Sequence, residues 1–263
     1  MSDETQTIDV ARLFSLSGHV AFVTGGAGGL GRAAAEGYLK AGAAVALADL
    51  DAAAVEAAAT ALAPFGRVIA LACDVTDAAS VAGAVDAAVE RLGRIDILLA
   101  AAGIARRTAA TDLATDEFQR VMDVNVKGTF LTAQAVGRHL IARRAPGKII
   151  TVGSVRGLVG HPLGYVAYGT SKGAVHLLTR QLATEWAKHR INVNSIAPSV
   201  LKTPLADFIL KTPEVRDLFM SRIPMGRAAD PAELVGAMIF LASAAADFIT
   251  GQVLFVDGGS VAG

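Results

Sequence analysis

Short apolar runs and longer stretches of helical periodicity alternate along the whole chain of 263 residues. Brief apolar runs bounded by turn or breaker residues predict seven strands, at Val20–Thr24, Ala44–Ala48, Val68–Cys73, Ile95–Ala100, Lys148–Val152, Asn192–Ile196 and Gln252–Val256. Periodic apolar positions predict helices at Leu30–Ala41, Ala52–Leu62, Ala78–Leu92, Asp116–Arg143, Val166–His189 and Pro231–Ala244. Continuous apolar strands that alternate with helices are typical of a parallel sheet covered on both faces, so we expect an α/β fold.

Composition and charge limit the domain organisation and the partners. No linker or repeat divides the alternating pattern, so we expect one domain over residues 16–263. We expect residues 1–15, which precede the pattern, to form a polar N-terminal tail. Because 24 basic side chains balance 24 acidic ones, we expect neither a nucleic-acid nor a membrane partner. The N-terminus lacks a signal-peptide layout, and the single Cys73 cannot form an internal disulfide, so we expect a cytoplasmic location.

A glycine-rich segment follows the first predicted strand. Five of the seven residues in Gly25–Gly31 are glycine, and the segment opens a predicted helix. Glycines let backbone N–H groups approach a pyrophosphate, and a helix N-terminus favours an anion, although an ordinary tight turn is the alternative. Asp49 ends the second predicted strand, at about the 20-residue offset where a carboxylate binds the adenosine ribose. The two features together favour a dinucleotide site.

The charges around Asp49 indicate which dinucleotide is bound. A 2′-phosphate carries about −1.5 to −2 charges at neutral pH. Asp49 and Asp51 would repel it, and positions 26–28 and 50–53 hold no Lys or Arg. Arg32, the one nearby cation, lies beyond the last glycine of the loop. We therefore predict NAD rather than NADP, and we predict no metal.

Three residues suggest proton-transfer chemistry. Tyr168 and Lys172 are four positions apart on a predicted helix, so both project from one face. A phenol with a pKa near 10 is a poor base, but a neighbouring ammonium and an oxidised nicotinamide favour the phenolate. Ser154 ends the fifth predicted strand, at the sheet edge where parallel sheets bind ligands. Taken singly, each is also typical of a solvated helix face or a turn; together they indicate a catalytic site.

At this point the sequence resembles the short-chain dehydrogenase/reductase family over almost its whole length, from Leu16 to Gly259. The order and spacing of several short motifs carry the resemblance. They are Thr24-Gly25-xxx-Gly29-x-Gly31, Asp74-Val75, Asn125 within Val124–Gly128, Ser154, Tyr168-xxx-Lys172, Asn194–Pro198, Thr203-Pro204, Thr250–Gln252 and Val256–Gly259.

The resemblance implies a fold, a reaction and a set of site residues. The fold is a single-domain Rossmann fold with a doubly wound, seven-stranded parallel sheet, and the reaction is NAD(H)-dependent hydride transfer between nicotinamide and a secondary alcohol or ketone. Tyr168 is the acid/base, Ser154 orients the substrate oxygen, Lys172 also holds the nicotinamide ribose, and Asn125 anchors a proton-relay water. For Asn125 alone, a buried amide that satisfies backbone groups is the simpler interpretation. The implied cofactor contacts are Gly25, Gly28, Gly29, Leu30, Gly31, Asp49, Asp74, Val75, Gly103, Asn125, Tyr168, Lys172, Pro198 and Thr203.

The chain departs from the family pattern at three points. The usual Asn-Asn-Ala-Gly after the fourth strand is Ala100–Gly103, which removes amides that brace the sheet. The usual Pro-Gly after the sixth strand is Pro198-Ser199, so a positive φ is less favourable there. Ser154 and Tyr168 stand one residue further apart than the pattern expects, which makes Tyr165 a rival base, but only Tyr168 has a lysine four positions on.

The substrate is predicted from charges that follow the strands. Residues 204–226, hereafter the lid segment, occupy the place where the family has a substrate lid, and they mix apolar with basic side chains. Arg106 and its neighbour Arg107, together with Arg156 and His161, suggest an anionic or polyhydroxylated substrate, with solvated loop charges as the alternative. Similarity to the sugar-acid, gluconate-type branch is carried by Ile104–Arg107 and Leu182–His189.

Two other functions stay open, together with the oligomeric state. The enzymatic alternative is a 3-hydroxyacyl or hydrophobic secondary-alcohol dehydrogenase, and the alternative from another class is a non-catalytic, NAD-sensing Rossmann protein. By resemblance, the long helices predicted at Asp116–Arg143 and Val166–His189 pair across a two-fold axis, so we expect a homodimer or a homotetramer.

Overall fold

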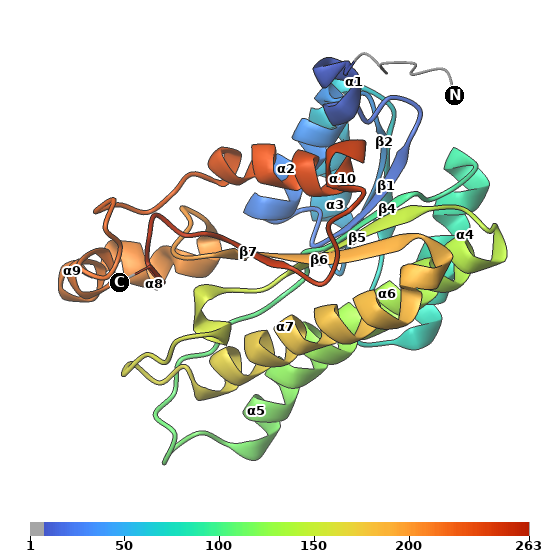
Figure 1. The fold of residues 1–263 in the computed structure, drawn as a ribbon. Helices are drawn as coiled ribbons and strands as arrows, with labels where there is room; N and C mark the ends of the chain where they lie inside the picture. Colours follow the sequence, from blue (N-terminus) through green and yellow to red (C-terminus); the bar gives the residue numbers. More distant parts are fainter. Residues whose placement is uncertain (1–7, 263) are drawn as a thin grey trace.

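The computed structural model describes residues 8–262, and its strands form one parallel sheet (Figure 1). The strand order is β3-β2-β1-β4-β5-β6-β7. The strands are β1 (Val20–Thr24), β2 (Ala44–Asp49), β3 (Val68–Ala72), β4 (Ile97–Ala100), β5 (Gly147–Val152), β6 (Ile191–Pro198) and β7 (Val253–Val256). The direction of winding reverses between β1 and β4, which is where such sheets bind their ligands. The predicted doubly wound Rossmann fold is confirmed.

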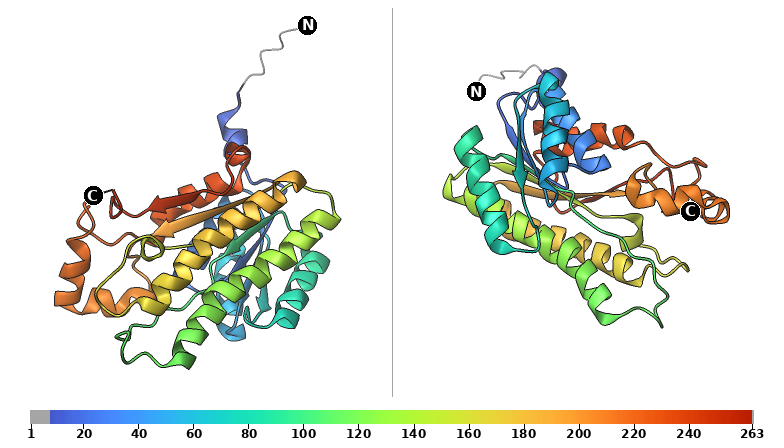
Figure 2. Two further views of the ribbon diagram at one scale, coloured as in Figure 1. Left: turned by 60° about the horizontal axis from the view of Figure 1, so that its bottom comes forward. Right: turned by 180° about the vertical axis from the view of Figure 1, so that it is seen from behind.

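Alternation along the strands builds a core on each face of the sheet. In β1, Ala21 and Val23 face a cluster packed against the helices α2 (Gly29–Lys40), α3 (Ala52–Leu62) and α10 (Val235–Ala242). Val20 and Phe22 face the opposite cluster, which packs against α4 (Ala78–Leu92), α6 (Gly128–Ala142) and α7 (Val166–Trp186). The views in Figure 1 and Figure 2 agree that α4, α6 and α7 run across one face of the sheet.

Two of the predicted helices are interrupted. The segment predicted as one helix over Asp116–Arg143 consists of α5 (Thr115–Met122), a π-helical turn η2 (Asp123–Lys127) and α6. The segment predicted as Pro231–Ala244 starts as a 3-10 turn, η6 (Pro231–Leu234), before α10 begins. Apolar periodicity does not distinguish a π-turn or a 3-10 turn from an α-helix, because each shifts the pattern by less than one residue per turn.

Several short elements have no counterpart in the sequence pattern. They are α1 (Val10–Phe14), α8 (Asp207–Lys211), α9 (Pro213–Met220), and the 3-10 turns η1 (Ala63–Phe65), η3 (Val155–Gly157), η5 (Pro204–Ala206) and η7 (Ala244–Ala246). A further 3-10 turn, η4 (Ala187–His189), forms the end of the helix predicted over Val166–His189. Helix α1 lies within the predicted polar tail, whose residues 1–7 lie outside the described residues. Helices α8 and α9 lie within the lid segment and pack around Phe219 and Ile223. No helix of the described part of the chain is long and apolar enough to span a membrane.

Candidate active site

A cavity of about 270 Å³ opens at the carboxyl ends of the central strands. Most of the predicted site residues line it: Gly25, Gly28, Gly29, Leu30, Gly31, Gly103, Ser154, Arg156, Tyr168, Lys172, Pro198 and Thr203. Asp49, Asp74, Val75, Asn125, Arg106 and His161 do not line this cavity. The fold therefore brings the predicted nucleotide loop and the predicted proton-transfer residues together, although they are far apart along the chain.

The glycine loop packs closely on its own backbone and on the segment after β4, and only residues without a side chain fit at these crossings. A Cβ on Gly31 would lie 2.2 Å from the Gly25 carbonyl oxygen. Gly25 has a φ of +66° and lies against the backbone of Ala101, where a Cβ would come within 2.9 Å. Helix α2 begins at Gly29, and no side chain caps its first turn. Uncapped N–H groups at a helix N-terminus suit a pyrophosphate, so the residues present fit a dinucleotide.

Carboxylates gather at the carboxyl ends of β2 and β3. Asp49 accepts a hydrogen bond at Oδ2 from the Ala27 backbone N–H at 3.1 Å, which ties the carboxylate to the glycine loop. Burial raises the pKa of the Cys73 thiol to about 11, and the negative charges of Asp74, Asp49 and Asp77 act in the same direction. This end of the dinucleotide site is therefore negatively charged.

Asp74 and Val75 support this region without lining the cavity. Asp74 Oδ1 accepts hydrogen bonds from the backbone N–H and the hydroxyl of Thr76, both at 2.8 Å. A Cβ on Gly128 would lie 2.7 Å from the Val75 side chain, so the start of α6 packs directly on Val75.

Tyr168 and Lys172 lie one turn apart on α7, as the spacing predicts. Lys172 Nζ lies 5.7 Å from the Tyr168 ring centroid and donates a hydrogen bond to the Val152 carbonyl at 2.7 Å. Burial lowers the pKa of Lys172 to about 8. Burial also raises the pKa of the Tyr168 phenol, whereas its hydrogen bond with Ser154 and the charge of Arg156 lower it. Among the protein's own groups, burial dominates and keeps Tyr168 protonated at neutral pH.

Ser154 follows the end of β5 and is held by hydrogen bonds to its hydroxyl and from its backbone N–H. Its hydroxyl oxygen accepts a hydrogen bond from the Arg156 N–H at 3.2 Å. Its own backbone N–H donates to His176 Nε2 at 3.4 Å. Burial, together with the charges of Arg180 and Lys172, lowers the pKa of His176 to about 4, so its ring is neutral and can accept. Sequence reasoning missed His176; its position one turn after Lys172 on α7 was the available signal.

Asn125 lies in the π-turn η2, and its side chain is fully buried. Its Oδ1 accepts from the Ile104 N–H at 2.8 Å, and its Nδ2 donates to the Ile104 carbonyl and to Ser171 Oγ, both at 2.9 Å. The amide therefore joins the segment after β4 to α7. This geometry matches the simpler interpretation of a buried amide that satisfies backbone groups, and the proton-relay water stays a prediction.

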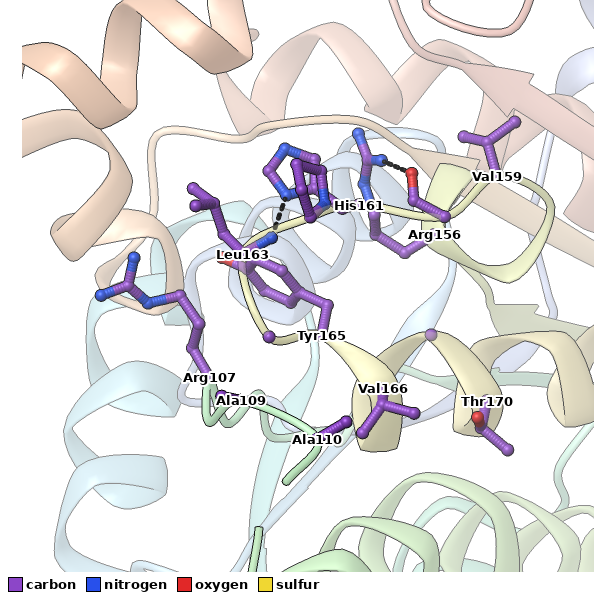
Figure 3. A pocket seen from close by; sticks show the side chains of 14 residues that line it. Arg107, Ala109, Ala110, Arg156, Val159, His161, Leu163, Tyr165, Val166 and Thr170 are labelled. Atoms are coloured by element: carbon purple, nitrogen blue, oxygen red, sulfur yellow. Dashed lines mark hydrogen bonds between the residues drawn. The ribbon is translucent and has the colours of Figure 1, made fainter. Parts of the chain in front are cut away.

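A second cavity of about 730 Å³ adjoins the first, and Figure 3 shows its side chains. Arg156 and Tyr165 line both cavities, and His161 lines the second. Arg106 lines neither; it pairs with Glu117 at 3.9 Å. Its neighbour Arg107, which follows the same strand, lines the second cavity, and its guanidinium lies 3.6 Å from the Phe208 ring centroid.

The additional residue between Ser154 and Tyr168 is accommodated in the loop before α7. Gly164 adopts a φ of +70°, and its carbonyl accepts a hydrogen bond from the Thr108 N–H at 3.0 Å. Tyr165 follows, with its ring centroid 6.1 Å from that of Tyr168. Burial raises the pKa of Tyr165, and Arg107 and Arg156 lower it. Tyr165 therefore faces arginines, whereas Tyr168 has Ser154 and Lys172 beside it.

The other two departures from the family pattern, the alanines after β4 and Ser199 after β6, leave the hydrogen bonds at the strand ends intact. The Ala102 N–H donates to Thr24 Oγ1 at 3.4 Å, so the backbone of the alanine segment contacts the end of β1. Ser199 has no positive φ, and its hydroxyl donates to the Asp257 carbonyl at 3.0 Å. Within residues 8–262, no group of three or more His, Cys, Asp or Glu side chains is placed to hold a metal ion.

Comparison with known proteins identifies the family. A family model described as enoyl-(acyl carrier protein) reductase matches residues 25–260. Galactitol 2-dehydrogenase (L-tagatose-forming) of Cereibacter sphaeroides is 40% identical over 255 residues, which cover 96% of this chain and 98% of that protein. A solved short-chain type dehydrogenase/reductase from Mycobacterium marinum has a TM-score of 0.93 and 39% identity, covering 97% of this chain and 100% of that chain. A gluconate 5-dehydrogenase from Burkholderia cenocepacia J2315, solved in complex with NADP and tartrate, has a TM-score of 0.93 and 37% identity, with the same coverage. The chain therefore belongs to the short-chain dehydrogenase/reductase family and is an oxidoreductase that acts on CH–OH groups.

Proposed function

We propose that the protein is an NAD-dependent dehydrogenase that interconverts a secondary alcohol and a ketone, with a polyol or a sugar acid as its substrate. The observation that carries this proposal is the meeting of Ser154, Tyr168 and Lys172 with the glycine loop on one cavity. A hydroxyl, a phenol and an ammonium beside a nucleotide loop are the groups that hydride transfer with proton exchange needs. The same arrangement disfavours a protein that only senses NAD.

Each of the three residues has a separate task at the substrate oxygen. Tyr168 takes the hydroxyl proton during oxidation and returns it during reduction. The Ser154 hydroxyl donates a hydrogen bond to the same oxygen and orients it. The positive charge of Lys172 favours the Tyr168 phenolate and opposes the effect of burial. A nicotinamide bound beside these residues would supply the hydride acceptor or donor for the substrate carbon.

The preference for NAD over NADP rests on the carboxylates near the glycine loop. Asp49 is held by Ala27, and Asp74 and Asp77 lie close enough to act on Cys73. A 2′-phosphate brought to this region would meet negative charge. We expect kcat/KM to be higher with NAD than with NADP, and Asp49→Ala to narrow the difference. The Burkholderia cenocepacia relative binds NADP, so a higher kcat/KM with NADP in the unmodified protein would overturn this part of the proposal.

The substrate class is tested by following NADH formation at 340 nm. A panel of polyols, sugar acids and hydrophobic secondary alcohols separates the proposed function from its alternatives. Apolar lid residues such as Ile209, Phe219 and Ile223 line the catalytic cavity, which favours hydrophobic secondary alcohols as the second candidate. Turnover of polyols or sugar acids supports the proposal. If the pure protein binds NAD and oxidises no member of the panel, the NAD-sensing alternative is favoured.

We also propose that the protein assembles as a homodimer or a homotetramer through α6 and α7. Phe130 on α6 is 37% exposed and Leu177 on α7 is 55% exposed, so each helix presents a large apolar side chain to solvent. Closed symmetry is the common result of such self-complementary faces. A monomer mass in light scattering at micromolar concentration would contradict the proposal. A cytoplasmic location stays a prediction.

A further inference from the structure

Arg107 and Arg156, which line the second cavity, have no carboxylate partner within the described residues. Among residues 8–262, no acidic side chain lies within ion-pair distance of Arg107, Arg156 or Arg222. Arg156 is partly buried, and its guanidinium donates to the Gly160 carbonyl at 3.0 Å. Burial and the positive charge of Arg222 both lower the pKa of Arg156. Arg107 and Arg222 are exposed, so the desolvation cost falls on Arg156, a partly buried cation without an anion.

His161 adds an unpaired hydrogen-bond donor to this cluster. Its Nδ1 accepts from the Leu163 N–H at 3.3 Å. Burial and the charges of Arg156 and Arg222 lower the pKa of His161 to about 4, so the ring is neutral and its proton is on Nε2. Within the described residues, Nε2 is buried and has no hydrogen-bond partner. A buried donor without an acceptor is rare in folded proteins, which points to an acceptor that binds there.

The second cavity communicates with the catalytic cavity. Arg156 and Tyr165 line both, and Tyr165 contacts Tyr168 edge to face. Figure 3 shows Arg156, His161 and Tyr165 on the single loop that leads into α7. One substrate molecule can therefore place a secondary hydroxyl at Tyr168 and extend a second polar group towards Arg156.

We propose that this second group is a carboxylate, bound by Arg156 and His161, so that the enzyme selects a sugar acid over the neutral polyol with the same carbon chain. A carboxylate carries negative charge and only accepts hydrogen bonds, so it satisfies both the Arg156 guanidinium, which has no acidic partner, and the unpaired His161 N–H. A polyol hydroxyl offers no charge and leaves the arginines unpaired. This inference rests on the proposed dehydrogenase function and names its substrate class.

The test compares acid and alcohol pairs that differ at one carbon. D-gluconate with D-sorbitol, and D-galactonate with galactitol, are assayed with NAD, and the ratio of kcat/KM for acid over polyol is the readout. We expect the ratio to exceed one and to fall about 10-fold or more in Arg156→Gln, the scale for a lost hydrogen bond to a charged group. Arg156→Lys retains the charge and should recover part of the ratio. His161→Phe keeps the stacking on Phe219, whose ring centroid is 4.3 Å away, and should also lower the ratio.

Arg216→Gln is the matched control. Arg216 lies on α9 with Phe219, is exposed, pairs with Asp217 and lines neither cavity, so this variant removes a lid charge without touching the site. Its acid-to-polyol ratio should equal that of the unmodified protein. A ratio below one, or a ratio that Arg156→Gln and His161→Phe leave unchanged, overturns the carboxylate site while the proposed function stands.

A binding measurement keeps the two proposals distinguishable if no compound is oxidised. In that case the proposed function fails, and thermal melting with NAD present compares D-gluconate with D-sorbitol at equal concentrations. A rise in Tm with gluconate alone, lost in Arg156→Gln, supports the carboxylate site. Equal shifts for the two compounds, or no shift with either, overturn it.

Discussion

Replacing Gly31 with alanine tests whether the glycine loop depends on the close crossing of two backbones. The new Cβ would lie 2.2 Å from the Gly25 carbonyl oxygen and 2.9 Å from the Gly25 carbonyl carbon, and both atoms are backbone. Real Cβ contacts are not shorter than 3.0 Å, so the two segments would have to separate by about 0.8 Å. A displacement of about 1 Å in a binding loop costs on the order of 100-fold. We therefore expect kcat/KM for NAD to fall about 100-fold in Gly31→Ala.

The assay measures NAD affinity and thermal stability together, because a distorted loop and an unfolded protein both lose activity. NADH binding is followed by its fluorescence, and the Tm is recorded for the same sample. Gly83→Ala is the control: Gly83 lies in α4 with no atom within 4 Å of the added Cβ, so alanine should leave NADH binding unchanged and stabilise the helix by about 0.5–1 kcal/mol. The reasoning is refuted if Gly31→Ala, with a normal Tm, binds NADH within twofold of the unmodified protein.

The remaining predictions concern the proton-transfer residues. Tyr168→Phe removes the base and keeps the ring, so turnover should fall about 100-fold or more while NAD binding persists, as measured by stopped-flow turnover and NADH fluorescence. Tyr165→Phe should retain most turnover; a larger loss there than in Tyr168→Phe would mean that Tyr165 is the base. Oxidation should increase with pH through an apparent pKa below 10, because the charges of Lys172 and the nicotinamide must outweigh the burial that raises the pKa of Tyr168. Lys172→Met should weaken NAD binding and move the pH profile of kcat/KM to higher pH; an unchanged profile would exclude Lys172 as the activating charge. His176→Leu removes the acceptor of the Ser154 N–H, so kcat should fall and KM for NAD should change little.

The strands were predictable because parallel strands covered on both faces are continuously apolar, as Val20–Thr24 illustrates. The grouping of Ser154, Tyr168 and Lys172 was predictable for a related reason: a residue at a strand end and two residues one helical turn apart keep their relation in any fold of this class. The positions of site residues in loops could not be predicted in this way, because no local rule fixes where a loop side chain lies.

The unpredicted parts of the site depend on contacts between distant segments. Arg106 was selected from its position after the fourth strand, but only the fold brings Glu117 to within 3.9 Å of it and Arg107 to the cavity. The stacking of His161 on Phe219 joins the loop before α7 to helix α9, which lie far apart along the chain. The short helices α8 and α9 depend in the same way on the cluster around Phe219, which their own sequences do not specify.

The π-turn η2 makes the chain sensitive to changes of length at one point inside a helical segment. A π-turn holds one residue more than the α-helical turn it replaces, and helix α5 is oriented relative to α6 by that surplus residue. Deleting a single residue such as Val126 would restore an uninterrupted α-helix and rotate α5 by about 100° around its axis relative to α6. Asn125 would then lose its hydrogen bonds to Ile104 and Ser171, and these bonds connect the segment after β4 to α7. A one-residue deletion here should therefore be more harmful than one in an exposed loop, where insertions and deletions are usually tolerated.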